Sequence, residues 1–252
     1  MFTISNFVGE LNGKLNHREK FIVLDVEGYS TTRPYNVGYI VGDNYGTIYT
    51  KRSFALPSCI WENIHAMLNT RQAETMTKKN VEEILTDFEN KRTKRKYQNV
   101  SVNEFMNIFE KDIAKFKVKK VFAYNVNFDK GSLKRLFGER FNSLGVEFCD
   151  IITAILETKL LTKKYCNFCI ANNYITEKGN IMTKAEIVYR YLTNDLTFEE
   201  EHTGLSDCYI EYFILLTAIN THKKINTNPT QAWRKLKEFT NTNGIIVPIP
   251  TV

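Results

Sequence analysis

FIVLDVEGYS, residues 21–30, joins an apolar run to two acidic side chains and a glycine. The run FIVL at 21–24 has the length and composition of a central strand buried on both faces. Asp25 and Glu27 follow at its end, and because residues two apart on a strand project from the same face, their carboxylates should converge. Such a pair repels unless a cation lies between them, and oxygen-rich acidic sites suit hard divalent ions. For this pattern alone, two acids fraying into solvent is the commoner outcome, so partner residues elsewhere must decide.

The chain after this strand predicts a sheet that begins as an antiparallel meander. Strand-like runs at 35–42 and 47–54 flank residues 43–46, where asparagine and glycine indicate a hairpin turn. Two further strands are expected at 118–124 and 144–148, with a helical segment between them. The sequence therefore predicts an α/β fold with a mixed five-stranded sheet, an antiparallel meander plus parallel strands, flanked by helices.

Helical periodicity covers much of the rest of the chain. Residues 57–96 predict a helical insertion, and the S-x-x-E pattern of Ser101 and Glu104 is a capping box that should start the next helix. Asp150 is positioned to cap the helix after the last strand. The other expected helices are residues 127–137, 160–172, 183–192, 204–221 and 231–239. We expect one domain over residues 1–225, with the insertion near 57–100, and a C-terminal helix and extended tail over 226–252.

The composition is that of an ordinary globular protein, with 43% hydrophobic and 25% charged residues among 252. A net charge of +6 permits a polyanionic partner without requiring one. No apolar run approaches the roughly 20 residues that span a bilayer, and the N-terminus turns polar too soon for a secretory signal. Five scattered cysteines fit a reducing compartment. We therefore expect no membrane association and a cytoplasmic location.

Two later segments carry residues that can complete an acidic site. In VFAYNVNFDK, residues 121–130, an apolar strand ends at Asn125 and Asp129 opens the next helix, near a strand end where α/β sites gather. Taken alone, Asp129 would more often be a helix cap. In EEEHTGLSD, residues 199–207, His202 precedes Asp207 by five residues. This spacing lets Asp207 face the sheet from a helix while His202 hangs over the same point from the preceding loop.

Together these segments resemble the DEDDh family of 3′–5′ exonucleases, which belongs to the ribonuclease H-like superfamily. Asp25-Val26-Glu27 matches the first motif, Asn125 through Asp129 the second, and His202 with Asp207 the third, in the family's order. The resemblance runs from about residue 21 to 216, with the helical insertion longer than the family's minimum. It implies a ribonuclease H-like sheet and phosphodiester hydrolysis.

The family's chemistry assigns a role to each matched residue. By resemblance, two divalent ions, Mg²⁺ or Mn²⁺, flank the scissile phosphate, one activating water and the other stabilising the leaving oxygen. Asp25 would bridge both ions, Glu27 and Asp207 would hold the ion on the nucleophile side, and Asp129 would support the second. His202 would deprotonate the attacking water, a task that suits histidine near neutral pH. Nucleoside 5′-monophosphates would leave from the 3′ end of single-stranded DNA or RNA.

Substrate contacts are expected from two regions. The family often has Thr or Ser directly after the glutamate, whereas here Gly28 and Tyr29 intervene before Ser30, so this segment departs from the motif. On and beside the second motif, basic and amide side chains are placed to contact the nucleic-acid backbone. The candidate contacts are Gly28, Tyr29, Ser30, Asn125, Lys130, Lys134 and Arg135. The basic run at 91–96 offers another phosphate-binding surface, although a solvated helix end accounts for it equally well.

Cys166 and Cys169 form half of a zinc pattern without a second pair at metal-binding spacing, which favours buried or incidental cysteines.

Two alternatives to a general exonuclease remain open. One is a related enzyme that acts on very short oligonucleotides or on a nucleotide signal, and the other is a degenerate module that grips a nucleic-acid end without cutting it. The intact acids and histidine argue against the second. The motifs do not distinguish ribose from deoxyribose.

Overall fold

The computed structural model describes residues 18–28, 34–56, 97–157, 163–177, 179–221, 239–242 and 245–248, with the single residues 86, 90 and 228. Its strands are β1 (Lys20–Gly28), β2 (Pro34–Asp43), β3 (Ile48–Ala55), β4 (Gln98–Asn99), β5 (Lys120–Ala123), β6 (Glu147–Asp150), β7 (Phe239–Thr242) and β8 (Ile245–Pro248). Its helices are α4 (Val102–Phe116), α5 (Asn127–Phe137), the 3-10 helix η1 (Gly138–Leu144), α6 (Ile151–Glu157), α7 (Lys163–Ala171), α8 (Ala185–Thr193) and α9 (Gly204–Thr221).

The main sheet of the described residues is mixed and has six strands, in the order β4-β3-β2-β1-β5-β6. The pairs β1–β2 and β2–β3 are antiparallel, whereas β5 is parallel to β1 and β6 is parallel to β5. The α/β class, the antiparallel meander and the parallel strands are therefore confirmed. The predicted count of five strands is wrong, because the two-residue strand β4 pairs with Phe54 and Ala55 at the edge of the sheet.

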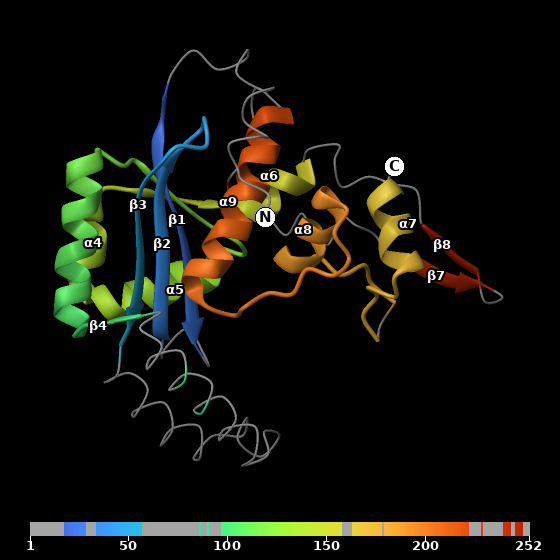
Figure 1. Ribbon diagram of the computed structural model, residues 1–252, viewed down its shortest axis with the longest axis horizontal. Helices are drawn as coiled ribbons and strands as arrows, with labels where there is room; N and C mark the ends of the chain where they lie inside the picture. Colours follow the sequence, from blue (N-terminus) through green and yellow to red (C-terminus); the bar gives the residue numbers. More distant parts are fainter. Residues whose placement is uncertain are drawn as a thin grey trace.

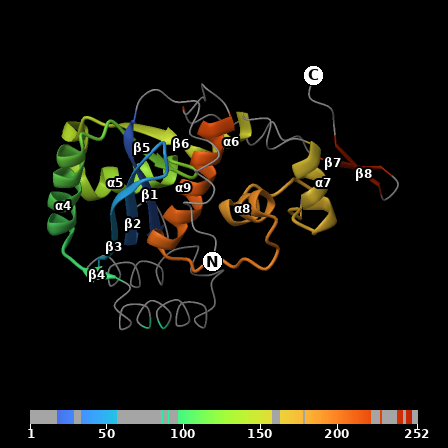
Figure 2. The same ribbon diagram turned by 45° about the horizontal axis from the view of Figure 1, so that its top comes forward.

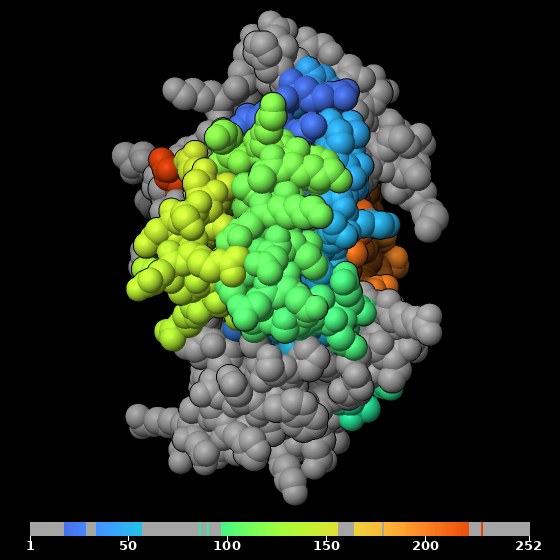
Figure 3. Space-filling model, turned by 90° about the vertical axis from the view of Figure 1, so that its left-hand side faces the viewer, coloured from blue at the N-terminus to red at the C-terminus, as the bar shows by residue number. Residues whose placement is uncertain are grey.

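Helices cover both faces of this sheet (Figures 1 and 2). One layer holds α4 and α5, and the other holds α9 with α6 and α8 beside it. β1 is buried on both sides as predicted: Ile22 and Leu24 pack in the cluster that includes Phe105 of α4, while Phe21 and Val23 pack in the cluster that includes α9. Figure 3 views the first layer from outside, where the surface of α4 fills the centre.

Several predicted helices have the expected limits. α5 and α9 begin and end at the expected residues. The capping box at α4 is confirmed, since the Glu104 amide donates to Ser101 Oγ (3.2 Å) and the Ser101 amide donates to Glu104 Oε2 (2.8 Å). The strand expected at 144–148 begins only at Glu147, because η1 occupies 138–144 and Gly145 follows with φ 63°.

Other expectations fall largely outside the described residues. Those are the helical insertion, except residues 86, 90 and 97–100, and the helix at 231–239, except Phe239. β7 and β8 pair antiparallel within the expected tail. No helix in the described parts of the chain combines the length and apolar character needed to cross a membrane.

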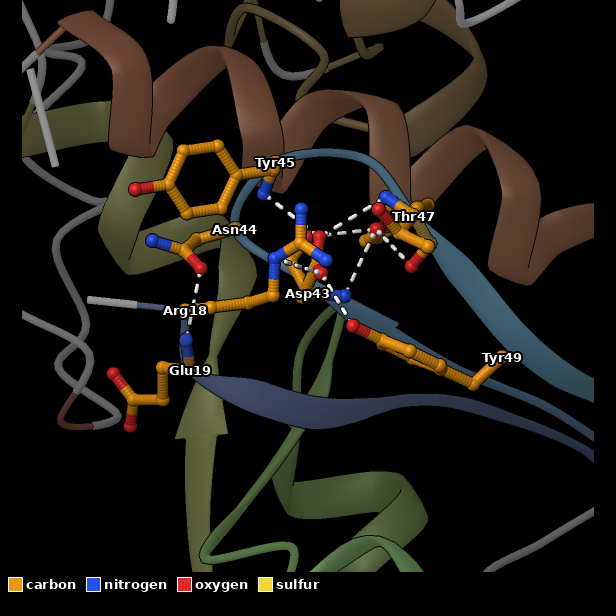
Figure 4. A network of polar contacts seen from close by, with 8 residues as sticks. Arg18, Glu19, Asp43, Asn44, Tyr45, Thr47 and Tyr49 are labelled. Carbon is orange, nitrogen blue, oxygen red and sulfur yellow. Dashed lines mark hydrogen bonds and ion pairs between the residues drawn. The ribbon is translucent and has the colours of Figure 1, made fainter. Parts of the chain in front are cut away.

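Asp43 holds the hairpin turn between β2 and β3 (Figure 4). Its Oδ1 accepts hydrogen bonds from the backbone amides of Tyr45 (2.9 Å) and Thr47 (3.0 Å), and its Oδ2 accepts one from the Tyr49 hydroxyl (2.8 Å). Arg18 Nε lies 3.4 Å from the same Oδ2. These contacts confirm the predicted turn and explain why a fully buried aspartate is tolerated there.

Two polar side chains fix α9 on the sheet. The buried Asn36 of β2 donates from Nδ2 to the Phe54 carbonyl (2.6 Å) and accepts at Oδ1 from the Gly204 amide (2.8 Å). Farther along the helix, the Tyr212 hydroxyl donates to the Asp43 carbonyl (2.7 Å) and accepts from the Asp43 amide (3.1 Å). Buried hydrogen bonds therefore fix α9 on the sheet at two places, at Gly204 and at Tyr212.

Glycines allow the start of α9 to lie directly on the strands. A Cβ atom at Gly38 of β2 would lie 2.0 Å from the Gly204 carbonyl carbon, and one at Gly204 would lie 2.8 Å from the Asp25 carbonyl oxygen. Both obstacles are backbone atoms, which cannot rotate away. The first turn of α9 is thus held against the end of β1.

Gly38→Ala should therefore displace α9 and destabilise the protein. We expect a loss of about 3 kcal/mol from overpacking, seen as a fall in melting temperature of about 6–12 °C for a chain of this size. Gly145→Ala is the control, because its Cβ meets open space and only its φ of 63° is unfavourable, at a cost of about 1 kcal/mol. Equal melting temperatures for the two variants would contradict the close approach.

Candidate metal centre

Three carboxylates from β1 and α9 meet at one point. Asp25 and Glu27 at the end of β1 and Asp207 in the first turn of α9 each offer an oxygen, and these oxygens lie within 4.8 Å of one another. The structure thus brings together Asp25 and Glu27 of the first motif and Asp207 of the third, which lie far apart in the sequence. Carboxylate oxygens at this spacing can hold a hard divalent cation.

Asp207 is held by the local structure of the helix start. Its backbone amide donates to the Thr203 carbonyl (3.0 Å), and the Ser206 hydroxyl donates to its Oδ1 (3.0 Å). Thr203 Oγ1 accepts from the Ser206 amide (3.2 Å), as an N-cap side chain does. The carboxylate therefore sits at the positive end of the α9 dipole.

Asp129 lies beside the three carboxylates and contacts β1 through the backbone. It is 2% exposed, and its Oδ1 accepts a hydrogen bond from the Val26 amide (2.9 Å), between the two acids of β1. The N-cap of α5 is Val126, without a side-chain cap, so Asp129 does not serve as that cap. It is not part of the group of three within 4.8 Å.

Asp150 at the end of β6 positions the loop that leads to Asp129. Its Oδ2 accepts hydrogen bonds from the amide and hydroxyl of Thr153, which confirms the expected cap on α6. Its Oδ1 accepts from the Val126 amide (3.1 Å), next to Asn125, whose φ is 61°. The Asp150 carboxylate therefore fixes the starts of both α5 and α6.

His202 lies at the edge of the cluster, on the loop that the sequence indicated. Its Nδ1 is 3.6 Å from Glu200 Oε2, and ligand atoms of Glu200, His202 and Asp207 lie within 4.8 Å of one another. The side chain is 74% exposed. Arg190 of α8 holds the loop by donating from Nε to the Phe198 carbonyl (2.8 Å). The exposed imidazole thus lies beside Asp207, the residue that its group shares with the three carboxylates.

Two acids near the cluster were missed by sequence reasoning. Glu200 sits in the run Glu199–Glu201, which gave no sign of which member turns inward. Glu211, one turn after Asp207 on α9, is 3% exposed. Its signal was present, because it is an acid four residues from Asp207 in an otherwise apolar segment.

Burial and repulsion between like charges raise the pKa of Asp207, Asp25 and Asp129. Burial, with Glu200 and Glu27 nearby, raises the pKa of Asp207 to about 8. Burial, followed by the charges of Glu211 and Glu27, raises the pKa of Asp25, and burial also raises that of Asp129. Asp25 Oδ2 has no hydrogen-bond partner among the described residues. A divalent cation fits this donor set, since it would supply the missing counter-charge.

The metal-free protein should lose stability as the pH rises from about 4 to 8. An unfolded Asp207 titrates near its ordinary pKa of 3.8 and the folded one at about 8, so the folded state binds more protons between these values and its stability falls with pH. Thermal denaturation in chelator at pH 5 and pH 8 measures this. Asp207→Asn should flatten the slope, and a rise in stability over this range would contradict the repulsion.

The predicted substrate residues lie around the cluster to different degrees. Gly28 is half-buried at the end of β1, Asn125 is exposed beside Asp129, and Tyr29 and Ser30 fall outside the described residues. Lys130, Lys134 and Arg135 are exposed on α5. The basic run at 91–96 also falls outside the described residues.

Cys166 and Cys169 are buried in the apolar cluster against α9. Among the described residues, neither belongs to a group of potential metal ligands. Their burial agrees with the interpretation of buried cysteines.

No protein-family model matches this chain, and no curated protein matches it.

Proposed function

We propose that this protein is a divalent-metal-dependent 3′–5′ exonuclease that removes 5′-mononucleotides from single-stranded nucleic acid. The observation that carries the proposal is the meeting of Asp25, Glu27 and Asp207 within 4.8 Å, with His202 and Glu200 in a second group of this kind that shares Asp207. The mixed sheet, with β1 at its centre, is compatible with a ribonuclease H-like fold.

Each residue contributes a distinct step. Two divalent ions, Mg²⁺ or Mn²⁺, would supply Lewis-acid stabilisation of the phosphate and activation of water. Asp25, Glu27 and Asp207 would hold these ions, and Asp129 braces β1 by accepting a hydrogen bond from the Val26 amide. His202 takes the proton from the attacking water. Glu200, 3.6 Å from Nδ1, favours the tautomer that leaves Nε2 able to accept that proton.

Cleavage of a 5′-labelled oligonucleotide tests the proposal. We expect a ladder of products shortened from the 3′ end in Mn²⁺ or Mg²⁺ and none in chelator. Binding without products in either ion would support the non-cleaving module. A series of lengths from two to about twenty nucleotides, in matched DNA and RNA, would separate a general exonuclease from an enzyme for very short oligonucleotides or a nucleotide signal.

The four cysteines that the structure describes are buried thiols. Thiols in this state fit a reducing compartment, which supports a cytoplasmic site of action.

Replacing Lys130, Lys134 and Arg135 by alanine should weaken substrate binding and flatten its salt dependence. Each lost phosphate contact reduces the slope of log K against log salt by roughly one unit. Fluorescence anisotropy at several salt concentrations measures the slope, with Lys119→Ala as control, because Lys119 is exposed and precedes β5, at the end of the parallel strands opposite to the acids. An unchanged slope in the triple variant would show that the nucleic acid does not contact these three side chains.

A further inference from the structure

Glu211 is a buried carboxylate with an oxygen that bonds to nothing in the described chain. It lies on α9 among apolar residues and is 3% exposed. The Tyr124 amide donates a hydrogen bond to the carboxylate, whereas Oε2 has no hydrogen-bond partner among the described residues. Burying a carboxylate oxygen without a hydrogen-bond partner costs folding free energy. A ligand that pairs with Glu211 Oε2 would remove this cost.

The surroundings of Glu211 are acidic. It lies near Asp129 and Asp207, and among the charged neighbours of Asp25 it has the strongest effect. No Lys or Arg of the described residues forms an ion pair with it. Asp25 Oδ2 is unpaired as well. One cation between the two carboxylates would give both Asp25 Oδ2 and Glu211 Oε2 a partner.

Asp129 differs from Glu211 because neither of its oxygens is among the buried atoms that lack a hydrogen-bond partner in the described residues. Its Oδ1 already accepts the Val26 amide at 2.9 Å, which ties the carboxylate to β1. Mg²⁺ is commonly held by only one or two carboxylates, with water and substrate phosphate completing the shell. A pair made of Asp25 and Glu211 meets this requirement, although Glu211 stands outside the group of three within 4.8 Å.

We propose that Asp25 and Glu211 together hold the second divalent ion, with Asp129 positioning β1 instead of binding the ion. This inference rests on the proposed two-ion exonuclease and names the carboxylate that completes it. Glu211 would add negative charge to the buried part of the cluster. The second ion would then depend on a residue one helical turn beyond the third motif.

Calorimetric titration of the full chain with Mn²⁺ tests this proposal without measuring cleavage. Wild type should bind two ions. Glu211→Gln keeps an acceptor for the Tyr124 amide but removes the charge, so it should weaken the second ion at least about tenfold and leave the first within about threefold. Asp129→Asn should change both affinities by less than about threefold. Glu211→Gln should also melt no lower than wild type in chelator, because a repelling charge is lost.

The opposite pattern, with Asp129→Asn losing the second ion and Glu211→Gln keeping it, would overturn the proposal. If Glu211→Gln does not fold, Glu211→Asp decides, since it retains the charge and shortens the side chain by one methylene: a weakened second ion supports the proposal, and wild-type binding overturns it. A wild type that binds one ion but still cleaves would overturn this inference alone. A wild type that binds no Mn²⁺ would overturn the proposed function too.

Discussion

Asp25→Asn should reduce oligonucleotide cleavage at least about a thousandfold, a loss of about 4 kcal/mol in transition-state stabilisation, while the metal-free protein stays as stable as wild type or gains stability. Asp25 belongs to the group of three carboxylates within 4.8 Å, so its removal breaks the site that would hold both ions. The neutral amide also removes one of several like charges that are buried together, which relieves their repulsion.

Two measurements check this expectation: single-turnover cleavage in Mn²⁺, and thermal denaturation in chelator. Glu27→Gln and Asp207→Asn should behave in the same way, because they supply the other two oxygens of the group. Glu147→Gln is the matched control, since this exposed acid begins β6, at the end of the parallel strands opposite to the three carboxylates. Near-native turnover in any of the three site variants would contradict the proposed metal centre.

The fold was predictable where the signal is local. The run FIVL, the capping box of Ser101 and Glu104, and the limits of α5 and α9 all depend on residues within a few positions of one another. β4 was not predictable, because two residues carry no periodicity and the strand exists only through pairing with β3. The late start of β6 follows from the left-handed backbone of Gly145, which an apolar run does not reveal.

The site was predictable to the extent that motifs carry it. The spacing of Asp25 and Glu27, and of His202 and Asp207, led to side chains that meet in space. Long-range contacts decided the rest: Asn36 bonds to Gly204 across 168 positions, and Gly38 admits the helix backbone only because it lacks a Cβ. Glu211 is different, because its spacing of four residues from Asp207 was visible in the sequence, although its closeness to Asp129 and Asp207 depends on how α9 packs.

His202→Ala should lower turnover by roughly two to four orders of magnitude while leaving metal binding intact. The imidazole is 74% exposed and stands beside Asp207 and Glu200, at the solvent edge of the cluster. Replacing His202 therefore removes the general base and leaves the carboxylates of Asp25, Glu27 and Asp207 in place. Calorimetry with Mn²⁺ should therefore give wild-type affinities, in contrast to Asp25→Asn.

The pH profile separates a general base from a residue that only anchors its loop. Wild-type turnover should fall at acid pH, where a protonated general base can no longer accept the proton of water, whereas His202→Ala should instead recover part of its activity as hydroxide becomes available at alkaline pH. Glu200→Gln is the comparison, since it keeps the imidazole but removes the carboxylate 3.6 Å from Nδ1, and it should reduce turnover less. If His202 were structural, removing it would lower the melting temperature together with activity and preserve the acid limb of the profile, because the proton acceptor would lie elsewhere.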